Sequence, residues 1–274
     1  MEDSAPERAS GSATYTPAAD HPFPDARLNH CIEHVRADTE IRAFLDAQNV
    51  NPVTRKQYND HGTEHVEIVT DRALSLYELL KRDGVGFNGA RDQGLEEADE
   101  PVIIHLAATL HDIGHIVHRD DHPYYSIPLA NRLLDRLLPE LGYDTSETVR
   151  MKGEILHAIL CHHTAEQPLT AEAGVVRIAD ALDMERGRSR IPYEEGGRGI
   201  NTLSSQAIKR VSLRPGEDRS VLVEIEMTDA VGVFQVDELL KAKVEGSSLE
   251  AQIRIVALNI DEESGQRLVE RIEL

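Results

Sequence analysis

The sequence predicts a mainly α fold, in which a helical bundle is followed by a small α+β domain. Through the first two thirds of the chain, apolar residues recur three or four positions apart, which is typical of amphipathic helices. From about Ser204 the pattern changes to alternation and β-branched residues, which are typical of strands. We therefore expect a disordered, Ser/Pro-rich tail over residues 1–25, a helical domain over 26–200 and an α+β domain over 204–274.

The helices are expected in a regular order along the first domain. Their predicted ranges are 28–45 (one or two short helices), 66–80, 102–117, 125–138, 146–163 and 171–186. A Gly-rich, acidic loop is expected over 82–100. In the second domain, strands are predicted over 207–213, 221–227 and 249–258, with a helix over 236–244 between the last two. The role of this domain in regulation, dimerisation or substrate capping is left open.

Composition limits the compartment and the partners. The chain has 49 acidic and 29 basic residues, a net charge of −20 and only six lysines, whereas nucleic-acid and anionic-membrane binding both need a basic surface. No membrane-length apolar run, signal peptide or CxxC spacing is present, so we expect a cytoplasmic protein with reduced thiols. The excess of acid with scarce lysine resembles halophilic archaeal proteins, and an ordinary acidic protein is the alternative.

The strongest chemical signal is the segment H-L-A-A-T-L-H-D-I-G-H-I-V-H-R-D-D-H at residues 105–122. Five histidines lie in an otherwise apolar stretch, and buried polar groups are costly unless each finds a partner. A divalent metal is the partner that several imidazoles and a carboxylate can share. On a continuous helix, His111, His115 and His118 would share one face, with Asp112 displaced by about 100°.

Further candidate ligands lie outside this segment. His65 falls on or beside the apolar stripe of its helix, and the dyad His162-His163 ends another apolar helix. Asp180 is flanked by apolar residues, and a buried carboxylate is compensated when it coordinates a cation. His122 follows in a D-D-H-P turn.

Three arginines in a chain poor in basic residues are candidates for substrate binding. Arg186, Arg188 and Arg190 carry planar groups that suit phosphate oxygens, although they could equally neutralise the acidic surface. Asp183 could support the metal site or face Arg186 or Arg188. Whether His61 or His157 joins the site is open.

An ordered set of residues on separate predicted helices resembles the H…HD…D signature of the HD-domain metal-dependent phosphohydrolases. The set is His65, His111, Asp112 and Asp180. The resemblance covers about residues 58–190 and implies an HD-type helical bundle. His122, with the spacing H-P-Y-Y-S, and His162-His163 further resemble the two-metal members, including the HD-GYP phosphodiesterases. The GYP tripeptide itself is absent, because this chain reads H-H-T-A-E-Q-P-L-T.

This resemblance implies an enzyme that hydrolyses a phosphate ester with a metal-activated water. One ion would be held by His65, His111, Asp112 and Asp180, and a second by Asp112, His122, His162 and His163. His115 stands where many relatives have Lys or Glu, and could contact a phosphate or donate a proton to the leaving group. Imidazole with carboxylate suits Mn, Fe, Co, Ni or Zn, as one or two ions.

Three function classes follow from this resemblance. The first is a phosphohydrolase acting on a small phosphorylated substrate, such as a nucleotide, a cyclic nucleotide or a related phosphodiester or monoester. The second is an HD-fold diiron oxygenase, and the third is a non-enzymatic, metal-stabilised ligand-sensing protein. A homo-oligomer is compatible with each class.

Overall fold

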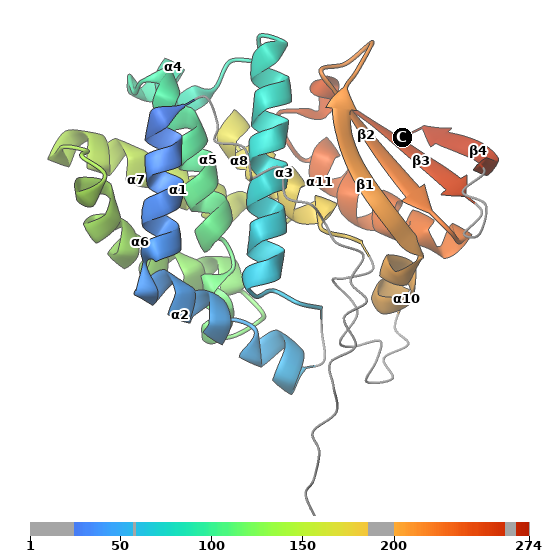
Figure 1. Ribbon diagram of the computed structural model, residues 1–274, viewed down its shortest axis with the longest axis horizontal. Coiled ribbons are helices and arrows are strands. Elements are labelled where there is room, and N and C mark those ends of the chain that lie inside the picture. Colours follow the sequence, from blue (N-terminus) through green and yellow to red (C-terminus); the bar gives the residue numbers. More distant parts are fainter. Residues whose placement is uncertain (1–24, 57–58, 186–199, 261–266, 274) are drawn as a thin grey trace, which may run out of the picture.

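The computed structural model describes residues 25–56, 59–185, 200–260 and 267–273. Figure 1 shows a group of helices on one side and a twisted sheet with its own short helices on the other. The predicted order, a mainly α part followed by a small α+β part, is confirmed. Apart from Asp25, the tail predicted over 1–25 lies outside the described residues.

The helical part is built around one fully buried helix. Its helices are α1 (Ala26–Ala37), α2 (Thr39–Ala47), α3 (Thr63–Arg82), α4 (Asn88–Gln93), α5 (Glu100–Leu110), α6 (His122–Glu140), α7 (Thr145–Cys161) and α8 (Ala171–Leu182). Every residue of α5 is buried, and α1, α3, α7 and α8 all pack against it. A helix that is apolar on all sides must lie at the centre of the core. The segments that follow α5 therefore begin inside the protein.

The helix predicted over 102–117 ends earlier than expected. Helix α5 stops at Leu110, and a 3-10 turn over Ile113–Ile116 follows it. The Ser126 hydroxyl replaces the missing helical hydrogen bonds: it donates to the His111 carbonyl at 2.7 Å and accepts from the Gly114 amide at 2.9 Å. Because buried backbone groups need partners, this side chain from α6 stabilises the break. His115 therefore leaves the predicted helical face, and His118 is exposed.

The C-terminal part is a mixed four-stranded sheet in the order β1-β2-β3-β4. Its strands are β1 (Ile208–Pro215), β2 (Val221–Met227), β3 (Ile253–Ile260) and β4 (Arg267–Glu273). The β1–β2 and β3–β4 pairs are antiparallel, and the β2–β3 pair is parallel. The crossover between β2 and β3 contains the predicted helix, as the helical segment Gln235–Lys241 and α11 (Ala242–Glu245). Strand β4 was not predicted.

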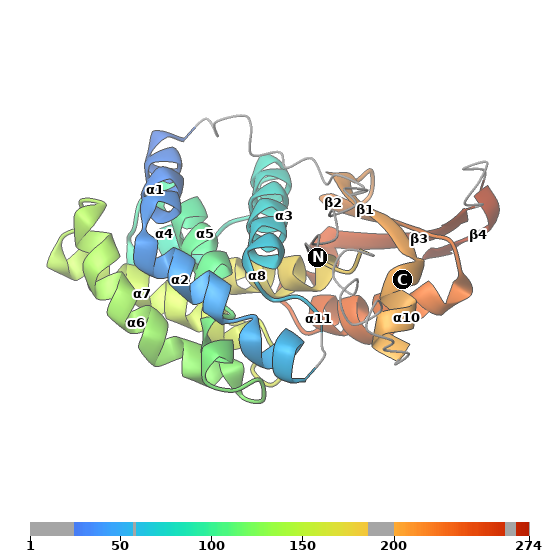
Figure 2. The same cartoon turned by 60° about the horizontal axis from the view of Figure 1, so that its bottom comes forward.

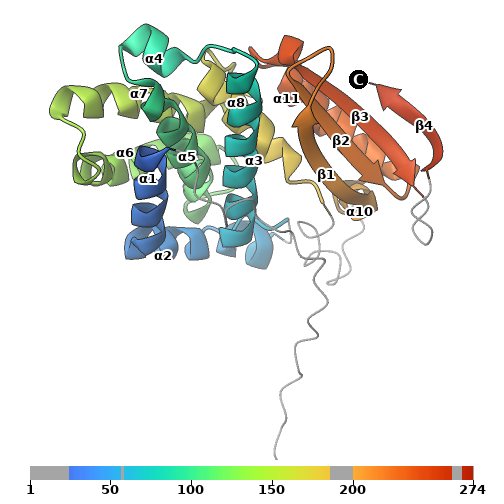
Figure 3. The same ribbon diagram turned by 45° about the horizontal axis from the view of Figure 1, so that its top comes forward.

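The two parts are continuous with each other. Helix α10 (Ile200–Ala207) leads directly into β1, and α11 packs against α8, as Figures 2 and 3 show from two directions. The Glu185 carboxylate accepts hydrogen bonds from the Val211 amide and from Arg72 on α3. Within the part of the chain that the structure describes, no helix combines the length and the apolar character needed to cross a bilayer.

Candidate metal centre

Six side chains from five helices meet in the interior of the helical part. His65 lies in the first turn of α3, His111 and Asp112 directly follow α5, His122 begins α6, His162 directly follows α7, and Asp180 lies in the last turn of α8. All six are buried, with exposed fractions of 0–9%. These are the residues that the sequence predicts as metal ligands, except for His163.

Four of the six form one cluster. Nε2 of His65 lies 3.3 Å from Nε2 of His111 and 3.5 Å from Oδ2 of Asp112. Nε2 of His111 lies 3.4 Å from the same Asp112 oxygen, and Oδ1 of Asp180 lies 3.5 Å from Nε2 of His65. Ligand atoms about 2.1 Å from one ion are about 3.0–3.4 Å apart, so these separations are close to those of a coordination shell.

The other oxygen of Asp112 belongs to a second cluster. Oδ1 lies 3.1 Å from Nε2 of His122 and 3.5 Å from Nε2 of His162. The two Nε2 atoms of His122 and His162 are 3.0 Å apart. Asp112 therefore stands between two groups of imidazoles with one oxygen turned to each, which is the arrangement of a bridging carboxylate.

Each of the four imidazoles is oriented through its other nitrogen. The Nδ1 partners are Oδ2 of Asp183 for His65 (2.6 Å) and the carbonyls of Ala108 for His111 (2.7 Å), Arg119 for His122 (2.9 Å) and Ile159 for His162 (2.6 Å). His111 and His162 are each at a helix C-terminus, where the last carbonyls lack helical partners. A carbonyl or carboxylate oxygen only accepts, so each Nδ1 carries a hydrogen, and in the neutral form of each ring Nε2 presents a lone pair.

This arrangement fits a cation and is unfavourable without one. Lone pairs on Nε2 face each other in both clusters, beside two carboxylates. Burial lowers the pKa of His162 to about 3, so this imidazole is neutral near pH 7. Although burial alone would raise it, the pKa of Asp112 is held well below its usual range by His111 and His115. The C-termini of α5, α7 and α8 turn their negative dipole ends toward this region, and the N-termini of α3 and α6 turn their positive ends toward it.

His115 is buried rather than open to a ligand. Its side chain is 0% exposed, its ring stacks on His122 with centroids 4.0 Å apart, and Nε2 lies 3.5 Å from Oδ1 of Asp112. His61 packs on its other side at 4.6 Å. Burial lowers the pKa of His115 to about 3. In this position His115 packs against Asp112 and His122 and does not face a ligand. Its predicted catalytic role stays a prediction.

Three other residues, for which the sequence left alternatives open, take different positions around the site. Asp183 orients His65, and His61 together with Asp112 and His115 forms a further group of adjacent ligand atoms. His157 instead accepts a hydrogen bond from the Leu169 amide at 3.0 Å. Arg186, Arg188 and Arg190 lie outside the described residues, so their predicted substrate contacts stay predictions.

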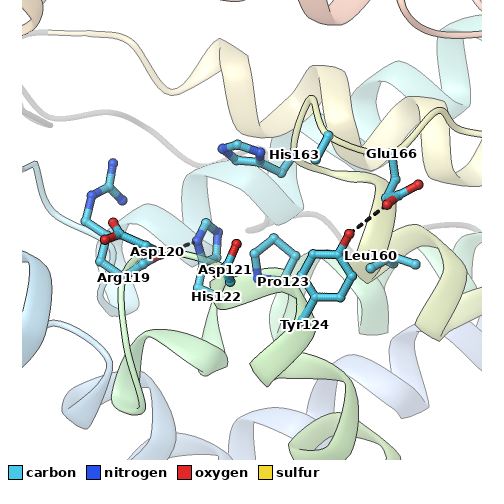
Figure 4. A pocket seen from close by; sticks show the side chains of 10 residues that line it. Arg119, Asp120, Asp121, His122, Pro123, Tyr124, Leu160, His163 and Glu166 are labelled. Atoms are coloured by element: carbon cyan, nitrogen blue, oxygen red, sulfur yellow. Dashed lines mark hydrogen bonds between the residues drawn. The ribbon is translucent and has the colours of Figure 1, made fainter.

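His163 lies apart from its neighbour in the dyad. Its ring is exposed, with its centroid 5.8 Å from that of His122, and its role as a ligand stays a prediction. His163 and His122 line a pocket of about 380 Å³ together with Arg119, Tyr124 and Glu166; Figure 4 shows these side chains. The Tyr124 hydroxyl donates to Glu166 at 2.6 Å. The second cluster therefore adjoins a pocket large enough for a small molecule.

Sequence reasoning missed one charged neighbour of the site. The Lys243 ammonium from α11 makes an ion pair with Oδ2 of Asp180. Nothing in the segment K-A-K at residues 241–243 distinguishes this lysine from a surface residue. The contact depends on the packing of α11 on α8.

Gly114 allows the segment after α5 to approach α6 closely. A Cβ atom at this position would lie 2.1 Å from the His122 carbonyl oxygen and 2.6 Å from the Ser126 amide nitrogen. We expect Gly114→Ala to lower the free energy of unfolding by about 2–3 kcal/mol or more, since backbone must move to relieve the clash. Chemical denaturation of the metal-free protein measures this change.

Gly153→Ala is the matched control. Gly153 lies within α7 with open space around its Cα, so alanine there should stabilise the protein by up to about 1 kcal/mol. Equal stability of the two variants would contradict the close packing at Gly114.

Comparison with protein families finds the HD domain at residues 63–185, which span α3 to α8 and all six clustered side chains. An uncharacterized protein of Methanocaldococcus jannaschii is 34% identical over 218 residues, covering 80% of this chain and 84% of that protein. No solved structure matches this chain.

Bacterial relatives are more distant. Ribonuclease Y of Desulforudis audaxviator is 26% identical over 252 residues, and ribonuclease Y of Desulforamulus reducens is 25% identical over the same length. Each match covers 85% of this chain and 45% of the relative, so this chain spans less than half of those proteins. The resemblance to halophilic archaeal proteins stays a prediction.

Proposed function

Because this chain belongs to the HD-domain family, a family of metal-dependent phosphohydrolase type, we propose that it hydrolyses a small phosphodiester at a dinuclear metal centre. The single observation that carries this proposal is the convergence of four imidazole Nε2 atoms on the two oxygens of Asp112. Bound ions would supply Lewis acidity to activate water and to polarise the phosphoryl group.

The residues of the chain have distinct roles in this proposal. His65, His111 and Asp180 would hold one ion, His122 and His162 would hold the other, and Asp112 would contribute an oxygen to each. Asp183 accepts the Nδ1 hydrogen of His65, and backbone carbonyls do the same for the other imidazoles, which fixes each ring. The mixed imidazole and carboxylate donors favour Mn, Fe, Co, Ni or Zn over Mg or Ca.

The pocket beside His122 favours a substrate of low negative charge. Its walls carry the carboxylates of Asp120, Asp121 and Glu166 and one arginine, Arg119. These carboxylates and the net charge of −20 would repel a polyanion more strongly than a phosphodiester, which carries one negative charge, while bound ions would attract the phosphoryl group of either. A cyclic nucleotide or a similar small diester is therefore favoured over a nucleoside triphosphate.

The proposal is tested with protein purified in the absence of chelator. We expect near two transition-metal ions per chain by elemental analysis, and hydrolysis of bis(4-nitrophenyl) phosphate and of cyclic nucleotides with added Mn²⁺. Chelator should abolish turnover, and Mn²⁺ should restore it. Protein that holds no metal after reconstitution would contradict the proposal.

RNA is a second candidate substrate, because several relatives carry the name ribonuclease Y. A labelled RNA decamer assayed beside the cyclic nucleotide separates the two. The acidic pocket predicts faster turnover of the small diester, and the reverse order would favour RNA.

The same preparations test the two other classes. Tightly bound, redox-active iron without phosphate-ester turnover would favour a diiron oxygenase. Metal that raises the melting temperature, with no activity on either kind of substrate, would favour a ligand-sensing protein.

A further inference from the structure

We propose that Lys243, supplied by the C-terminal α+β part, binds the substrate's phosphoryl oxygen at the metal centre. Its ammonium contacts Oδ2 of Asp180, while Oδ1 of that carboxylate faces His65 at 3.5 Å. One carboxylate thus joins the metal cluster to a lysine from a different part of the fold. This inference rests on the proposed function and names the group that would recognise its substrate.

The position of Lys243 is fixed by close packing between α11 and α8. A Cβ atom on Gly246 would lie 2.7 Å from Nη2 of Arg177, and one on Gly174 would lie 3.2 Å from Leu249. Arg177 in turn donates to the carbonyls of His163 (3.2 Å) and Glu166 (2.8 Å) in the segment that lines the pocket. This packing therefore fixes the position of α11, which carries Lys243, relative to α8 and to the segment that lines the pocket.

Lys243 is largely buried beside the metal residues. Its side chain is only 13% exposed, so the ammonium is poorly screened by water and acts strongly at short range. An ammonium group has three N–H donors, and the ion pair with Asp180 uses only part of that capacity.

Metal binding alone gives no reason for a lysine here. A cation beside a ligand carboxylate repels the metal and competes with it for the carboxylate oxygen. An anionic substrate gains from the same charge, because a phosphoryl oxygen can accept a charge-assisted hydrogen bond.

The test measures binding of inorganic phosphate to the Mn²⁺-loaded full chain by isothermal titration calorimetry. Lys243→Met should weaken phosphate binding about tenfold or more, raise KM for bis(4-nitrophenyl) phosphate and leave the metal content unchanged. Lys243→Arg should restore part of the affinity. Lys241→Met is the matched control, because Lys241 pairs with Asp237 and Glu245 on the surface, and its phosphate affinity should equal that of wild type.

The outcomes separate this inference from the proposed function. Wild type that hydrolyses the diester while Lys243→Met binds phosphate equally well would overturn the role of Lys243 alone. Loss of metal from Lys243→Met would also overturn it, since the lysine would then serve the metal residues. Wild type that neither binds phosphate nor hydrolyses any diester would overturn both proposals. Circular dichroism and thermal unfolding verify that each variant is folded.

Discussion

Replacement of Asp112 by asparagine is expected to remove most bound metal and to lower diester hydrolysis by about 10³-fold or more. Both oxygens of Asp112 face imidazole clusters, with Nε2 atoms at 3.1–3.5 Å, so the amide would remove the bridging charge and turn an NH₂ group toward one cluster. Loss of about 4 kcal/mol of transition-state stabilisation corresponds to that factor. Elemental analysis and initial rates measure the two effects.

Asp99→Asn provides a matched control for this variant. Asp99 is equally buried, but it pairs with Arg27 and accepts from the Tyr143 hydroxyl at 2.8 Å, away from the metal residues. This variant should lose about 1–3 kcal/mol of stability while keeping its metal and activity. Equal metal content in Asp112→Asn and Asp99→Asn would refute a bridging role for Asp112.

The sequence indicates which side chains come together, because buried imidazole and carboxylate in apolar helices are costly without a shared partner. His65, His111, Asp112, His122, His162 and Asp180 were all predicted and all meet. Their separation in the chain gives no distances, so the residues alone do not divide the Asp112 oxygens between two clusters, and that expectation came from the resemblance to two-metal HD proteins. That division depends on the tertiary packing of five helices.

The errors of the sequence analysis have tertiary causes. Periodicity carries the predicted helix through Val117, but Ser126 of α6 replaces its hydrogen bonds after Leu110 and ends it. Lys243 reaches Asp180 from 63 residues away. Strand β4 carries charged residues that weaken its alternation, and it is recognised only through its pairing with β3.

His162→Ala is expected to remove about one of two bound ions and to lower diester hydrolysis by about 10²-fold or more, since the second cluster would lose a ligand. Its Nε2 lies 3.0 Å from that of His122 and 3.5 Å from Oδ1 of Asp112. The ion held by His65, His111 and Asp180 should remain. Metal content measured without chelator, against wild type, gives the stoichiometry.

His163, the next residue in the chain, provides the variant with which His162→Ala is compared. His163 is exposed at the pocket, so we expect His163→Ala to keep both ions, with any effect confined to substrate binding. Loss of one ion from both variants would instead support the sequence-based prediction that both members of the dyad are ligands, which requires His163 to turn inward when metal binds. One ion in wild type and in both variants would mean a mononuclear centre, in which His122 and His162 act on the substrate or on Asp112.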